Sequence, residues 1–130
     1  MKTIKYEKLS DELIKRFPTF KDKYDHILSY FKPDKPGPHV VYGDILNPYL
    51  TSLLENSDQN KYELQQIFDF LELLSNHEDL HIQEIVQMTI LEYIGGKKEL
   101  ELEAKKFMGS KTKVLYDEIQ RFWDRKNKYK

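Results

Sequence analysis

The apolar residues of this chain recur every three or four positions, which is the spacing of an α-helix with one buried face. The clearest example is the set at i, i+4, i+7, i+8 and i+11 formed by Phe20, Tyr24, Ile27, Leu28 and Phe31. Nowhere do apolar and polar residues alternate between turn residues, as they do in a half-buried strand. The pattern therefore predicts an all-α protein.

Glycines, prolines and short polar runs divide the pattern into about six or seven helices. Two are expected early in the chain, over Ser10–Phe17 and from Pro18 to Phe31, and a proline-rich loop over Lys32–His39 follows them. The later helices are expected over Tyr42–Leu54, Tyr62–Leu74, Leu80–Ile94, Leu100–Met108 and Val114–Trp123. We expect these helices to pack as antiparallel hairpins around one core, in a single domain over residues 1–130.

Two of the expected helices have a distinctive composition. Pro48 falls within the third, so it is expected either in the first turns of that helix or at a break within it. The segment Leu80–Ile94 is apolar on nearly all sides, which predicts a buried central helix.

The boundary between the last two expected helices is also marked in the sequence. Gly109 is expected to end one helix, and Ser110 is expected to cap the next.

Composition excludes several classes of protein. The chain has no cysteine, so disulfides, thiolate metal sites and cysteine nucleophiles are absent, which is consistent with a reducing compartment. The first residues lack the continuous apolar region of a signal peptide. No apolar run approaches the roughly 18 residues that a membrane-spanning helix needs. These features predict a cytoplasmic protein without a membrane partner.

Charge is unevenly distributed along the chain. Residues 41–96 contain ten acids and one base, which gives −9, whereas the rest contains 20 bases and 12 acids, which gives +8. The overall charge of −1 therefore hides an acidic middle between basic ends. Such a field attracts a cationic partner and repels a polyanion, so nucleic acid is not expected as a ligand despite the basic C-terminal tail.

One segment matches a metal-binding motif. His77-Glu78-Asp79-Leu80-His81 has the H-E-x-x-H spacing of zinc hydrolases, in which two histidines share a helix face and the glutamate is the general base. The motif directly follows Ser75-Asn76, however, so His77 is expected at the start of a helix rather than in its middle. A first helical turn also favours acids through the helix dipole. We therefore predict no metal site, no cofactor and no catalytic residues.

Several stretches, in order along most of the chain, resemble a family of small uncharacterised all-helical bacterial proteins, some of which are associated with immunity in polymorphic toxin systems. The stretches are Phe17-Pro18-Thr19-Phe20, Tyr42-Gly43-Asp44, the run from Ile67 to Glu72 and on to Leu91-Glu92, Phe107-Met108-Gly109-Ser110, and Phe122-Trp123. The chain departs from the family pattern at His77-Glu78-Asp79 and Met108-Gly109-Ser110. The resemblance implies a binding protein and carries over no catalytic residue.

The leading hypothesis is therefore an immunity or antitoxin protein that binds a cognate toxin domain, expected to be a nuclease, through an acidic helical surface. The acids expected at this surface are Asp69, Glu72, Asp79 and Glu84, followed by Asp58 and Glu63. Two alternatives remain open, a zinc-dependent hydrolase that uses the HEDLH segment and a non-catalytic regulatory or scaffold module. The sequence leaves the toxin's identity and the oligomeric state open.

Overall fold

The computed structural model describes residues 3–128, and every regular element in that range is helical. Seven continuous helical stretches follow one another, with a 3-10 turn, η4 (Ser57–Gln59), between the third and the fourth. In chain order they are η1 with α1 (Tyr6–Lys8 and Leu9–Arg16), η2 with α2 (Pro18–Phe20 and Lys21–Phe31), α3 with η3 and α4 (Pro38–Val41, Tyr42–Leu46 and Asn47–Glu55), α5 (Lys61–Ser75), α6 with η5 and α7 (Leu80–Glu84, Ile85–Leu91 and Glu92–Ile94), α8 (Lys98–Lys105) and α9 (Ser110–Lys128). The all-α prediction is confirmed.

The third helix begins earlier than the sequence predicts. The loop was expected to reach His39, but α3 starts at Pro38, because the fixed φ of proline and its missing N–H suit the first position of a helix. Pro48 does not break this helix. Directly before it, the N–H of Asn47 bonds to the carbonyl of Tyr42 in a wider π turn, η3, and the helix continues into α4.

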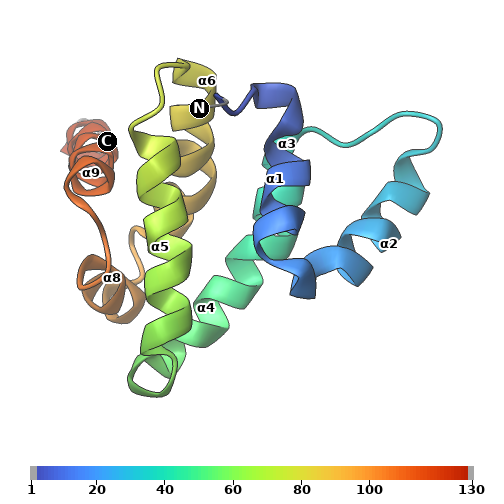
Figure 1. The fold of residues 1–130 in the computed structure, drawn as a ribbon. Coiled ribbons are helices and arrows are strands. Elements are labelled where there is room, and N and C mark those ends of the chain that lie inside the picture. The colour runs from blue at the N-terminus through green and yellow to red at the C-terminus, as the bar shows by residue number, and fades with distance from the viewer. Residues whose placement is uncertain (1–2, 129–130) are drawn as a thin grey trace.

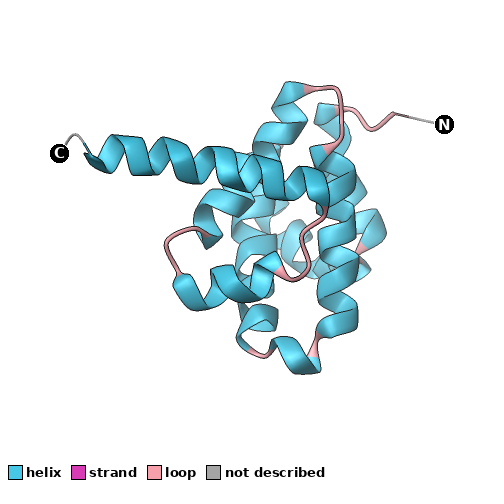
Figure 2. Ribbon diagram, turned by 90° about the vertical axis from the view of Figure 1, so that its left-hand side faces the viewer, coloured by secondary structure: helices cyan, strands magenta, loops and turns pink. Residues whose placement is uncertain are grey.

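The helices form a bundle with two projecting parts (Figure 1). The helix α5 lies in the centre, α1 and α3 lie on one side of it, and α8 and α9 lie on the other. The helix α2 extends away from the body and returns through the loop before α3. Turned by 90°, the molecule shows the C-terminal part of α9 extending past the other helices (Figure 2). Within residues 3–128 no helix is both long and apolar enough to cross a membrane.

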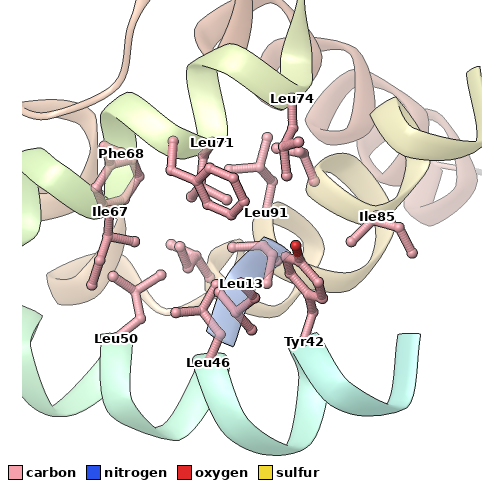
Figure 3. Packing of buried hydrophobic residues seen from close by; sticks show 14 of the residues in the cluster. Leu13, Tyr42, Leu46, Leu50, Ile67, Phe68, Leu71, Leu74, Ile85 and Leu91 are labelled. Carbon is pink, nitrogen blue, oxygen red and sulfur yellow. The ribbon is translucent and has the colours of Figure 1, made fainter. Parts of the chain in front are cut away.

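One cluster of buried apolar side chains joins the helices (Figure 3). In this view Leu46 and Leu50 of the third helix face Ile67 and Leu71 of α5. The helix that was expected to be buried on nearly all sides, α6 with η5 and α7, is buried on one side only. Its core-facing side chains are Ile82, Ile85, Val86, Ile90, Leu91 and Ile94, whereas Leu80, Met88 and Tyr93 are exposed. Burial of this apolar surface is the main force that stabilises the bundle.

The helix formed by α6, η5 and α7 contains a second π segment, η5 (Ile85–Leu91), which the sequence analysis did not predict. Its buried pairs, Ile85-Val86 and Ile90-Leu91, are five positions apart. In an α-helix, pairs on one face are three or four positions apart, so a turn with one additional residue is needed to keep both pairs toward the core. The two π segments, η3 and η5, pack on each other. At this contact the side chain of Asn47, directly after η3, donates a 3.0 Å hydrogen bond to the carbonyl of Thr89 in η5.

Replacement of Tyr42 by Phe is expected to lower the free energy of unfolding by about 1 kcal/mol. Tyr42 is fully buried, and its hydroxyl donates a 2.9 Å hydrogen bond to the Leu9 carbonyl, which ties η3 to α1. The matched control is Tyr30→Phe, because the Tyr30 side chain is 75% exposed. Urea denaturation of both variants measures the difference, and equal midpoints would show that the buried hydroxyl contributes nothing.

Candidate functional site

The six acids expected at the binding surface are strung along the molecule rather than gathered at one place. Asp58 lies in η4 before α5, Asp79 follows the end of α5, and Glu84 ends α6. The helix α5, which separates Asp58 from Asp79, has 15 residues, and this corresponds to a length of about 22 Å. A single patch that contains all six is therefore not formed.

Several of these acids have partners within the chain. Glu63 accepts a hydrogen bond from the Tyr49 hydroxyl, and burial together with this bond raises the pKa of Tyr49 to about 12. Asp79 caps α6 by accepting a 2.9 Å bond from the N–H of His81. Asp69 accepts a 2.8 Å bond from Gln65, and Glu84 lies 3.7 Å from Nδ1 of His81.

Glu72 has a structural role that the sequence did not indicate. Its carboxylate accepts hydrogen bonds from the N–H of Lys111 at 3.1 Å and from the N–H and hydroxyl of Thr112 at 2.9 and 2.8 Å. Asn76 donates a further bond at 2.8 Å. A side chain of α5 thus satisfies the free N–H groups at the start of α9, in the position where Ser110 was expected to cap. We therefore do not retain Glu72 as a binding residue.

A pocket of about 730 Å³ lies where the end of α4 and the turn η4 meet α8. Figure 1 shows α4 and α8 at the same end of the bundle. Its lining combines apolar, polar and acidic residues and includes no base, and its members are Leu54, Glu55, Asn56, Ser57, Asp58, Gln59, Glu99, Leu100, Leu102 and Glu103. We call this the acidic pocket, after its four carboxylates.

The carboxylates of the acidic pocket differ in how they are held. Glu103 accepts a 2.6 Å hydrogen bond from Ser57 and 3.0 Å bonds from Lys106. These bonds, that of Ser57 first, lower the pKa of Glu103, so it stays ionised. Among the described residues, no donor bonds to the carboxylates of Glu55, Asp58 or Glu99. The pocket thus offers three free anionic groups and one fixed one.

The chain was compared with protein families, curated proteins and solved structures. Residues 10–124 match a family described as a domain of unknown function, DUF7674. The chain belongs to the DUF7674 family. No curated protein and no solved structure matches it. The description of the DUF7674 family assigns no activity, so the immunity function that the resemblance implies stays a prediction.

Sequence reasoning found only part of the acidic pocket in this DUF7674 domain. Asp58 was expected at the surface, but Glu99 and Glu103 lie outside the acidic stretch 41–96 and were not considered. The hydrogen bond from Ser57 to Glu103 joins residues 46 positions apart, so local patterns could not reveal the contact. The available signal was the i, i+4 spacing of Glu99 and Glu103, which places both on one face of a helix.

The HEDLH segment of the DUF7674 domain does not have the geometry that its spacing suggests. The helix begins at Leu80, so His77 lies before the helix rather than at its start, where it was expected, and the two histidines do not share a helix face. Nδ1 of His77 accepts a 2.9 Å bond from the N–H of Asp79, and the His81 side chain is 76% exposed. Across residues 3–128, no three His, Asp or Glu side chains converge in a way that could hold a metal ion.

Proposed function

We propose that this protein is a non-catalytic binding protein of the immunity type, which neutralises a cognate toxin domain by covering its cationic surface. The observation that carries the proposal is the acidic pocket, with its four carboxylates and no lining base. A nuclease domain binds phosphates through lysine and arginine side chains, so an acidic surface competes for the same groups.

The composition of the pocket suits a basic side chain of a partner. The free carboxylates of Glu55, Asp58 and Glu99 supply acceptors for charge-assisted hydrogen bonds with a guanidinium or ammonium group. Leu102 in the lining is 65% exposed and offers apolar contact to the aliphatic part of such a side chain. Attraction of opposite charges mainly accelerates association and selects the partner, which is what rapid neutralisation of a toxin requires.

Co-expression tests this proposal. The C-terminal domain of the protein encoded immediately upstream is expressed with and without this chain, and growth is scored. Toxicity alone, together with growth when the chain is present, supports immunity. A harmless neighbour, or toxicity that the chain does not relieve, contradicts the proposal.

The variant Asp58→Lys/Glu99→Lys, which we call the pocket variant, is expected to lose rescue. The added lysines repel a cationic partner, so the rate constant for association should fall by about tenfold or more. For the wild type this rate constant should decrease with added salt, and for the pocket variant that decrease should disappear. The matched control is Glu7→Lys/Asp34→Lys, because both acids are exposed, lie outside the pocket and have no ion pair in the described chain. Rescue by the pocket variant at the wild-type level would show that the pocket is not the binding site.

A further inference from the structure

The apolar stripe of α9 continues past the point where the helix leaves the body. Leu115 and Ile119 are each 4% exposed, whereas Phe122, in the next turn, is 48% exposed. The ring of Phe122 lies 5.5 Å from that of Trp123, centre to centre. Figure 2 shows this part of the helix extending beyond the other helices. Trp123 is half-buried, so the exposed ring at the end of the buried stripe is that of Phe122. An exposed aromatic side chain in this position is typical of a contact surface without its partner.

Three bases and one acid, Asp124, flank these aromatic residues along α9. Arg121, Arg125 and Lys126 are exposed, and Nζ of Lys126 lies 4.9 Å from the centre of the Trp123 ring. The pairs 121/125 and 122/126 have i, i+4 spacing, so the bases and Phe122 share one side of the helix. None of these three bases forms an ion pair with another described residue. We call Arg121, Phe122, Trp123, Arg125 and Lys126 the α9 tip.

The chain itself contains a surface that complements the α9 tip. The acidic pocket has three free carboxylates for the bases, and the exposed Leu102 for the aromatic rings. The tip points away from the body of its own molecule, so it meets this pocket only on another one. We propose that the α9 tip of one copy docks in the acidic pocket of a second copy.

Two copies that make this contact reciprocally form a closed pair with two tip–pocket contacts. Each contact is small, and stable interfaces bury on the order of 1,000 Å² or more, so the pair is transient and its formation depends on concentration. The pair covers the acidic pocket and keeps it from other cationic surfaces until dilution or a stronger partner opens it. This inference rests on the charges and exposure of the chain, and not on the identity of a toxin.

Sedimentation velocity of the full chain tests the proposal. The weight-average sedimentation coefficient is expected to rise with protein concentration and to fall when NaCl is raised from about 0.05 to 0.5 M, because salt screens the contact. The tip variant Arg121→Glu/Arg125→Glu and the pocket variant Asp58→Lys/Glu99→Lys are each expected to associate at least about tenfold more weakly, which corresponds to about 1.4 kcal/mol. A wild-type protein that stays monomeric at all concentrations overturns the proposal.

A charge-swap mixture gives the sharper result. In a mixed pair, the acidic tip of the tip variant meets the basic pocket of the pocket variant. The second contact joins the unchanged basic tip of the pocket variant to the unchanged acidic pocket of the tip variant. Fluorescently labelled tip variant should therefore sediment faster with the pocket variant than with Glu7→Lys/Asp34→Lys, which has the same net charge but an acidic pocket. Equal sedimentation in the two mixtures contradicts the proposal.

Two further controls separate this inference from folding and from the proposed function. Lys5→Glu/Lys35→Glu carries the charge change of the tip variant at other exposed positions and should associate as the wild type does. Circular dichroism confirms that each variant is folded. The tip variant should keep toxin rescue, because its acidic pocket is unchanged. For the wild-type protein, rescue without self-association refutes only this inference, and self-association without rescue refutes only the immunity function.

Discussion

Replacement of Glu72 by alanine is expected to lower the free energy of unfolding by about 2–3 kcal/mol, the range for losing a helix cap and charge-assisted hydrogen bonds. The substitution removes the acceptor for two N–H groups at the start of α9 and for the hydroxyl of Thr112. Thr112 is fully buried, so its N–H and hydroxyl gain no water in exchange. Urea denaturation at neutral pH measures the loss.

The matched control for Glu72 is Asp69→Ala, on the same helix. Asp69 is exposed, and its one hydrogen bond, from Gln65, is local to α5, so we expect a change within about 0.5 kcal/mol. Equal losses for the two alanine variants would contradict the capping role of Glu72, because a surface carboxylate and a tertiary cap would then contribute the same.

The contribution of Glu72 should also depend on pH in a defined direction. Burial raises its pKa, but the hydrogen bonds from Thr112, Asn76 and Lys111 outweigh burial, and the pKa in the folded state is lowered. A lowered folded-state pKa stabilises the protein above the unfolded-state pKa, about 4.3, and this stabilisation is lost as the pH falls through the folded-state pKa. The difference in stability between wild type and Glu72→Gln should therefore be constant near neutrality and shrink below about pH 4.

Gly109→Ala is expected to cost about 2 kcal/mol, the second largest effect, because the new methyl group has no room. A Cβ at this position would lie 2.4 Å from Cδ and Oε1 of Glu72, so the carboxylate would have to leave the cap. Thermal denaturation of the variant measures this loss. The comparison is Gly43→Ala, where the added atom would meet only the Thr89 methyl group at 3.6 Å, and this variant should unfold no more easily than the wild type.

The double variant Glu72→Ala/Gly109→Ala separates the clash from other effects of the alanine. When the carboxylate is already absent, the methyl group has space, so Gly109→Ala should cost at least about 1 kcal/mol less than it does in the wild type. Additive losses in the two backgrounds would show that Gly109 is needed for a reason other than Glu72.

Local patterns predicted the helices well and the contacts between them poorly. The periodicity from Phe20 to Phe31 and from Leu80 to Ile94 predicted helices within a few residues of their observed bounds, because helical spacing is a property of neighbouring residues. The break at Gly109 was also predicted. Its cause was not, since the carboxylate that requires the glycine belongs to α5.

The candidate site shows the same division. Asp58 was recognised as an exposed acid from its polar surroundings, but the pocket exists only because η4 packs beside α8. Glu72 was interpreted as a surface acid because its sequence neighbours are acidic and apolar in a helical pattern. The three donors that it binds in α9 are about 40 positions away, so no local rule could distinguish it from Asp69.

The π segment η5 has a consequence for the length of the chain. The core-facing positions of the helix that contains η5 are 82, 85, 86, 90, 91 and 94. Removal of one residue between 86 and 90 converts them to the i, i+3, i+4, i+7, i+8 and i+11 set of a regular α-helix. Met88, which is 46% exposed, is such a residue. A chain that lacks Met88 would present the same core side chains from an uninterrupted α-helix, so this helix can lose one residue here without a change in which side chains form the core.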